Sequence, residues 1–239
     1  MLDALVIAPH PDDAELGMAG GILKMQAAGM RVGVLDLTTG EPTPHGTPEL
    51  RRAETAAATA VLGLEWRQNL GLPNRMLEPT LENRAALAGV IRVERPRWLF
   101  APYWEDAHPD HTAATKLVDD ARFWAKLSKT EGTAYELPGE RHHPQRVYHY
   151  YCVHLKLAPR PAFVLDISDV WPQKLASIRA YESQFITGRP APTDPSHPAA
   201  FIDQLTHEAA YWGKTIGAAY GEPYASREPL GLSGFGGLV

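Results

Sequence analysis

The sequence is poor in cysteine and has no long hydrophobic run. Cys152 is the only cysteine among 239 residues, which excludes an intramolecular disulfide and a thiolate zinc cluster. No apolar stretch approaches the roughly 20 residues of a membrane-spanning helix. The N-terminus also lacks the basic region and cleavage site of a secretion signal. We therefore expect a cytoplasmic protein that has no membrane partner.

An excess of positive charge is also lacking. The 23 Lys and Arg residues are scattered among 28 Asp and Glu residues, and the formal net charge is −5. Nucleic-acid-binding proteins gather basic residues on one face, so we expect no nucleic-acid partner. The hydrophobic share of 44% is ordinary for a globular protein. Because no repeat or linker divides the chain, we predict a single domain over residues 1–239.

Apolar runs of strand length alternate with segments of helical period in the first half of the chain. We expect strands at 4–8, 31–38, 65–70 and 98–103, and helices at 16–28, 47–62 and 80–95. This alternation is typical of βαβ units. It predicts an α/β fold with a Rossmann-like, mostly parallel sheet and helices on both faces.

The pattern changes after about residue 126. Further strands are expected at 146–155 and 162–167, at the other edge of the sheet. A helix through 170–185, capped by Ser168 or Asp169, and a last helix at 199–218 follow. Between these helices lies a proline-rich segment, 186–198, whose length is typical of a functional loop.

Two clusters of histidine and aspartate follow the ends of predicted strands. The first, at residues 10–13, reads "HPDD", and the second, at 108–111, reads "HPDH". Ligands of open α/β sheets bind at the carboxyl ends of the strands. A lone histidine or Asp-Asp pair is more often a structural residue or a helix cap. Two similar clusters at equivalent strand ends instead favour a shared site.

Two histidines and one carboxylate form a known catalytic zinc set that keeps one position open for water. We interpret His10, Asp13 and His111 as the ligands of one metal ion at the strand ends. The spacing itself does not separate Asp13 from Asp12. The residues left for other roles are Asp12, His108 and Asp110.

The two motifs, in "APHPDDAELG" and "APYWEDAHPDH", resemble those of the PIG-L, or LmbE-like, family of zinc-dependent N-acetylglucosamine deacetylases. The resemblance is closest to the bacillithiol branch, whose members deacetylate N-acetyl-α-D-glucosaminyl L-malate. Segments similar to this branch include "VGVLDLTTGE", "NLGLPN" and "IGAAYGEPYASREPLGL". In the first of these, Thr39 stands where the branch commonly has an arginine.

The resemblance implies a role for each residue of the two motifs. His10, Asp13 and His111 would bind zinc, and Asp12 would be the general base. A neighbouring histidine, His108, would stabilise the oxyanion formed from the amide. Such sites also accept iron, cobalt or manganese, so the expected cofactor is Zn²⁺, with Fe²⁺, Co²⁺ or Mn²⁺ as alternatives.

The resemblance also implies roles outside the metal centre. Asp110 would hold the imidazole of His108 in position. Arg51 would lie near the substrate, where it could pair with the malyl carboxylate, and Gln184 is a second substrate-binding candidate. We therefore expect a small N-acetylglucosamine-containing substrate and a homo-oligomer, often a hexamer in this family.

Two other functions are compatible with the same residues. The protein could deacetylate N-acetylglucosamine oligomers or another N-acetylglucosamine conjugate instead of the malate. It could also be a metal-dependent sugar-binding module without turnover. Rates measured on a panel of substrates would distinguish the first alternative from malate deacetylation. Tight binding of the ligand without any hydrolysis would identify the second.

Overall fold

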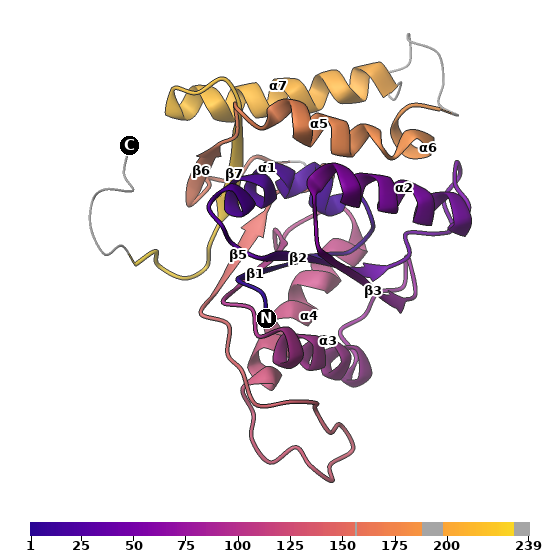
Figure 1. Cartoon of the computed structure of the whole chain (residues 1–239), viewed down its shortest axis with the longest axis vertical. Coiled ribbons are helices and arrows are strands. Elements are labelled where there is room, and N and C mark those ends of the chain that lie inside the picture. The colour runs from indigo at the N-terminus through magenta and orange to yellow at the C-terminus, as the bar shows by residue number, and fades with distance from the viewer. Residues whose placement is uncertain (156, 188–197, 232–239) are drawn as a thin grey trace.

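The computed structural model describes residues 1–155, 157–187 and 198–231. Its strands and helices alternate along most of the chain (Figure 1). In chain order the elements are β1 (Ala4–Ala8), α1 (Asp13–Ala27), β2 (Val32–Thr38), α2 (Pro48–Leu62), β3 (Trp66–Leu72), α3 (Leu81–Glu94), β4 (Trp98–Pro102), α4 (Pro109–Ala125), β5 (Arg146–Tyr150), β6 (Phe163–Asp166), α5 (Trp171–Arg179), α6 (Glu182–Phe185), α7 (Pro198–Ile216) and β7 (Gly221–Ala225).

The sheet has seven strands in the order β3-β2-β1-β4-β5-β7-β6. The first five run parallel, and β7 is antiparallel to both of its neighbours. The predicted mostly parallel α/β sheet is therefore confirmed, with β6 added at the expected edge. Because β1 and β4 are parallel neighbours, the chain leaves both strands at the same edge of the sheet.

Alternate residues of β1 face opposite sides of the sheet. Leu5 and Ile7 belong to the core packed by α3 and α4, whereas Val6 belongs to the core on the α1 side. Figure 1 shows α1 and α2 over one face, α5 and α7 outside them, and α3 and α4 over the other face. Helices thus cover both faces, as the sequence predicts.

Glycines in α1 allow close packing against the sheet. A Cβ atom at Gly17 would collide with the Tyr150 ring, and one at Gly21 would collide with the hydroxyl of Tyr224. The helix is interrupted at Met18, whose φ of −151° is not helical. Beyond this break, Glu222 accepts hydrogen bonds from the backbone nitrogens of residues 20 and 21, at 3.1 and 2.7 Å. These contacts fix the middle of α1 against the sheet.

The helix predicted through 170–185 is divided into α5 and α6. Its predicted cap is wrong, because α5 is preceded by Val170 and has no side-chain cap. The Ser168 hydroxyl instead donates to Asp166 and accepts from the backbone of Tyr220, while Asp169 pairs with a lysine of α1. Most of the predicted 186–198 loop, residues 188–197, lies outside the described residues.

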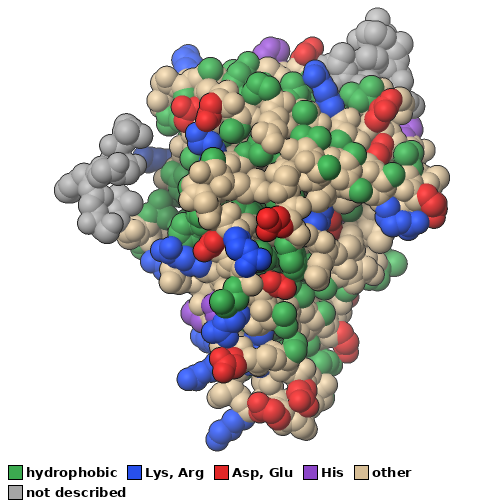
Figure 2. All heavy atoms as spheres, in the orientation of Figure 1, with side chains coloured by type: hydrophobic (Ala, Val, Ile, Leu, Met, Phe, Trp, Pro, Cys, Tyr) green, Lys and Arg blue, Asp and Glu red, His purple; other side chains and the backbone are tan. Residues whose placement is uncertain are grey.

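Figure 2 shows the charged side chains on one face of the molecule. Basic and acidic side chains are interspersed there rather than gathered by sign. In the described part of the chain, no helix combines the length and the apolar character needed to span a membrane.

Candidate metal centre and active site

The two His-Pro-Asp motifs meet at the carboxyl ends of β1 and β4. His10, Asp13 and His111 are buried there, and one ligand atom from each lies within 4.8 Å of the others. Asp13 Oδ2 is 3.1 Å from His10 Nδ1 and 3.4 Å from His111 Nε2. Residues about 100 positions apart thus form one polar group, because neighbouring parallel strands end together.

A second carboxylate lies behind each of the two histidines. Asp110 Oδ2 is 3.0 Å from His10 Nε2, and Asp106 Oδ2 is 3.1 Å from His111 Nδ1. Each imidazole therefore has one nitrogen against a carboxylate and the other directed toward Asp13. Metal-binding histidines in proteins almost always have such a carboxylate or carbonyl behind them. These residues consequently fit a divalent metal ion.

The electrostatics of this group also suit a cation. Burial acts to raise the pKa of Asp13, but His111 and His10 hold it well below its usual range. Burial acts to lower the pKa of His10, yet hydrogen bonds to Asp110 and Asp13 raise it to about 9. In the metal-free protein, protons thus provide the positive charge that the buried carboxylates need. A metal ion would replace these protons.

Two other groups of side chains also have closely spaced ligand atoms, namely His10, His108 and Asp110, and Asp106, His111 and Cys152. In the first group, the Asp110 carboxylate already accepts hydrogen bonds from the backbone nitrogens of Arg75 and Leu77. In the second, burial raises the pKa of the Cys152 thiol to about 11, so a metal ion there would have to displace a tightly held proton. Both groups are weaker metal sites than the group around Asp13.

Asp12 lies in the same cavity as the metal group, and its carboxylate pairs with Arg51 of α2. It precedes α1 with a φ of 123°, a backbone conformation that is strained for a residue with a side chain. Its Oδ2 accepts a hydrogen bond from Arg51 Nη1 at 2.9 Å. Burial raises the pKa of Asp12 to about 7, although Arg51 opposes this change. A carboxyl group with this pKa is suited to general-base catalysis near neutral pH.

His108 precedes α4 and caps it. Its Nδ1 accepts a hydrogen bond from the backbone nitrogen of Asp110 at 3.2 Å. Burial, together with His111 and His10, lowers the pKa of His108 to about 4. The ring is therefore neutral at pH 7, and because Nδ1 is an acceptor, Nε2 carries the proton. His108 can donate one hydrogen bond from this nitrogen.

The expected contact between the Asp110 carboxylate and His108 is not found. The carboxylate is used by His10 and by two backbone nitrogens, which lower the pKa of Asp110 to about 2 against the effect of burial. Only the backbone nitrogen of Asp110 meets His108, because this nitrogen lies in the first turn of α4 and needs a cap. In this structure the Asp110 carboxylate contacts His10, and its expected role toward His108 stays a prediction.

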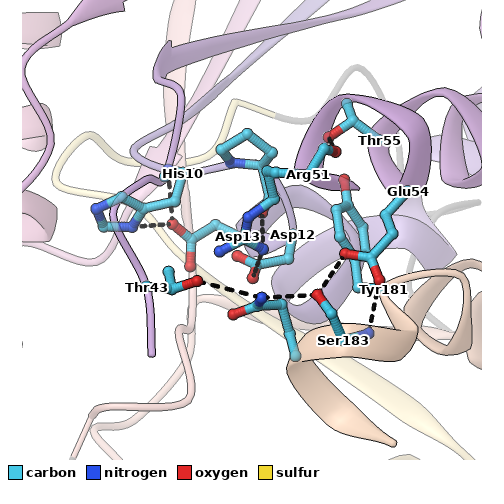
Figure 3. A network of polar contacts seen from close by, with 12 residues as sticks. His10, Asp12, Asp13, Thr43, Arg51, Glu54, Thr55, Tyr181 and Ser183 are labelled. Carbon is cyan, nitrogen blue, oxygen red and sulfur yellow. Dashed lines mark hydrogen bonds and ion pairs between the residues drawn. The ribbon is translucent and has the colours of Figure 1, made fainter. Parts of the chain in front are cut away.

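Arg51 lines the same cavity as the metal group, but its charge is already balanced. Its guanidinium contacts Asp12 at 2.9 Å and Glu41 at 3.5 Å. Figure 3 shows Arg51 beside Asp12, with a second set of contacts running from Thr43 toward Ser183 and Glu54. The other substrate-binding candidate, Gln184, donates from Nε2 to Ser183 Oγ at 2.9 Å and also lines the cavity.

The cavity over these residues has a volume of about 600 Å³, within the range of small-molecule sites. It is also lined by His154, whose ring centroid lies 5.6 Å from that of His108 and 5.7 Å from that of His111.

Two residues of the site, His154 and Asp106, are not indicated by the sequence. The strand predicted over 146–155 ends at Tyr150, so His154 lies in the following turn. The only sequence feature that could have pointed to Asp106 is its position, five residues before the expected metal ligand His111.

Comparisons with known proteins agree with this site. The PIG-L family, described as GlcNAc-PI de-N-acetylase, matches residues 5–122, which include both motifs. A diacetylchitobiose deacetylase of Thermococcus kodakarensis is 32% identical over 232 residues, covering 91% of this chain and 80% of the relative. The chain belongs to the PIG-L family. The family resemblance of the motifs is thus confirmed.

Two further relatives of this PIG-L protein are informative. A conserved protein of Thermus thermophilus has a crystal structure with a TM-score of 0.85 and 39% identity, covering 97% of both chains. A probable N-acetyl-alpha-D-glucosaminyl L-malate deacetylase 2 of Bacillus anthracis is 26% identical over 196 residues, covering 77% of this chain and 81% of the relative. The expected closeness to the bacillithiol branch is therefore backed only by the more distant of the two deacetylase relatives.

Proposed function

We propose that this protein removes the N-acetyl group from N-acetylglucosamine residues of short, neutral oligomers such as N,N′-diacetylchitobiose. Family membership makes the chain a metal-dependent N-acetylglucosaminyl deacetylase. The observation that carries the proposal is the buried group of His10, Asp13 and His111, with Asp12 beside it in the same cavity.

His10, Asp13 and His111 would hold the metal ion, and two histidines with one carboxylate favour Zn²⁺, while Fe²⁺, Co²⁺ and Mn²⁺ also suit such ligands. When bound, a divalent ion acidifies water and polarises the amide carbonyl. Asp12 takes a proton from the attacking water, and Arg51 holds the carboxylate of Asp12 in place at 2.9 Å.

His108 donates its Nε2 hydrogen to the carbonyl oxygen, which becomes negatively charged as water adds to the carbon. One such donor contributes roughly 100- to 1,000-fold to the rate in comparable sites. The departing amine nitrogen then needs a proton. A neutral His108 would become an anion by giving one, whereas Asp12 holds the proton that it took from water. Asp12 therefore returns this proton as the carbon–nitrogen bond breaks, and the products are acetate and the amino sugar.

The charge around the cavity supports a neutral substrate. Arg51, the expected partner of a malyl carboxylate, already faces Asp12 and Glu41. A third carboxylate would bring excess negative charge to this point. Thr39 also stands where the bacillithiol branch commonly has an arginine. The malate assignment made from the sequence is thus the less supported of the two.

One observation nevertheless favours the malate conjugate as a second candidate. Arg75 is exposed, lines the cavity and forms no ion pair in the part of the chain that the structure describes. Its cation could receive the carboxylates of a malyl group. The Bacillus anthracis relative, whose name refers to the malate, adds to this support.

The experiment that tests the proposal is a comparison of kcat/KM for amine release from three substrates by the zinc-loaded enzyme. The substrates are N,N′-diacetylchitobiose, free N-acetylglucosamine and N-acetylglucosaminyl malate. We expect the disaccharide to give the highest value. A higher value for the malate would replace the main proposal with the second candidate, and no turnover of any substrate would contradict both.

Three expectations from the sequence stay predictions. They are the homo-oligomeric state, which is often hexameric in this family, the cytoplasmic location and the single domain over residues 1–239.

A further inference from the structure

One wall of the catalytic cavity comes from helices that carry none of the metal or base residues. Phe185 of α6 and Phe201 of α7 line the cavity, together with Gln204. The two phenylalanine rings are stacked, with centroids 5.1 Å apart and planes inclined by 18°. Gln204 follows Phe201 by three positions and so lies on the same side of α7.

The α6 part of this wall is firmly anchored. The carboxylate of Glu54, on α2, accepts hydrogen bonds from Ser183 N at 2.6 Å and from Ser183 Oγ at 2.8 Å. Figure 3 shows these contacts joining the two helices. Because Ser183 stands two residues before Phe185, the contacts fix the aromatic wall relative to α2, which also carries Arg51. The position of the aromatic wall relative to Arg51, and through Arg51 to Asp12, is therefore fixed before a substrate binds.

The chemistry of the wall differs from that of the rest of the cavity. The charged and titratable side chains that line the cavity come from other segments, namely His10, Asp12, Asp13, Arg51, Arg75, His108, His111 and His154. In the described parts of α6 and α7, the lining residues are aromatic or carry an amide. An anion placed here would have no cationic partner, and burying an unpaired charge is costly.

A pyranose ring has the complementary surfaces. Its C–H groups form an apolar face that can cover a phenylalanine ring, and its hydroxyl groups can exchange hydrogen bonds with an amide such as that of Gln204. Aromatic walls with a few polar groups are typical of small-molecule sites.

From these observations we infer that Phe185, Phe201 and Gln204 form a subsite for a second, neutral sugar ring, which is linked to the N-acetylglucosamine being deacetylated. This inference rests on the proposed function and names its substrate more closely. The subsite would explain a preference for a disaccharide over the free sugar, because only the disaccharide can place a ring on the aromatic wall.

The test uses Phe201→Ala and Gln204→Ala in the zinc-loaded full chain. For each variant, kcat/KM is measured with N,N′-diacetylchitobiose and with free N-acetylglucosamine. We expect the ratio of the two values to fall about tenfold for Phe201→Ala, because the lost apolar contact affects only the substrate that reaches it. The fall for Gln204→Ala should be smaller, about threefold, since Gln204 is exposed and loses a single hydrogen bond.

A matched control is Phe123→Ala, which removes a phenylalanine that is 53% exposed on α4 and does not line the cavity. Its ratio should equal that of the wild type. Melting temperatures of all variants identify any loss of folding, and Gln204→Ala keeps the test valid if Phe201→Ala is unstable. Ratios within twofold of the wild type for both cavity variants would overturn the subsite.

A parallel arm uses Arg75→Ala and N-acetylglucosaminyl malate. If the malate is the best substrate and only Arg75→Ala impairs it, the group attached to N-acetylglucosamine lies at Arg75 and the inferred sugar subsite is wrong. Failure of the proposed function is read from the wild-type enzyme alone, which would then prefer the malate or release amine from none of the three substrates. Failure of the subsite alone leaves the disaccharide as the best substrate, with ratios that the cavity variants do not change.

Discussion

Replacement of Asp106 by asparagine should weaken zinc binding even though Asp106 is not an expected ligand. The side chain is 1% exposed, and its two oxygens have separate tasks. Oδ2 lies 3.1 Å from His111 Nδ1, and Oδ1 accepts from the backbone nitrogen of His108 at 2.7 Å. Asparagine has only one acceptor oxygen, so it cannot serve both positions.

The magnitude follows from the interaction that is lost. Oδ2 of Asp106 and Nδ1 of His111 are in ion-pair contact without the alignment of a hydrogen bond, and each factor of ten in affinity corresponds to about 1.4 kcal/mol. We expect the zinc dissociation constant of Asp106→Asn to rise by roughly 10- to 100-fold, which is the usual effect of removing a carboxylate behind a metal-binding histidine.

The assay is competition for zinc between the metal-free protein and a chromophoric chelator. Asp119→Asn is the matched control, because Asp119 lies on α4, the helix that follows Asp106 and carries His111, and pairs with Arg227 away from the metal group. The control should bind zinc as the wild type does. If Asp106→Asn folds with a normal circular dichroism spectrum and its zinc affinity stays within twofold of the wild type, the proposed role of Asp106 in orienting His111 is wrong.

Two further predictions concern the metal-free protein and its buried charges. Because the pKa of His10 is raised to about 9, protons compete with zinc below this pH, so zinc affinity should fall as the pH is lowered from 9 to 6. Titration calorimetry in two buffers of different ionisation enthalpy should detect proton release, and identical heats would contradict this. Arg67→Met should lower the free energy of unfolding by about 3–5 kcal/mol, because it leaves the buried carboxylates of Glu15 and Asp36 without their partner. Urea denaturation measures this change, and a loss below about 1 kcal/mol would refute it.

The fold could be predicted because local signals agree with the tertiary structure. The helix expected over 47–62 is an example, since Thr47 accepts a hydrogen bond from Leu50 N and Gly63 has the left-handed φ of a helix C-cap. β7 was missed, because Pro223 in "GEPYA" argues against an inner strand. Its place between β5 and β6 depends on partners distant in the sequence.

The meeting of the two motifs was predictable for the same kind of reason. Parallel strands that are neighbours end together, so His10 and His111 could be expected at one point. The hydrogen-bond and ion-pair partners of these side chains could not be predicted, because they depend on the path of the loop that leads into α4. Asp110 faces His10 rather than His108, and Asp106 reaches His111 across one turn of chain. Sequence spacing does not determine such directions.

The most direct test of the account is the rate of acetate release from N,N′-diacetylchitobiose by wild-type and Asp12→Asn proteins of equal zinc content. Metal-stripped wild type should be inactive and should recover when zinc is restored. Asp12→Asn should bind zinc normally and react at least roughly 100-fold more slowly, since it lacks the general base. Equal rates for the two zinc-loaded proteins, or an unchanged rate after removal of the metal, would contradict the account.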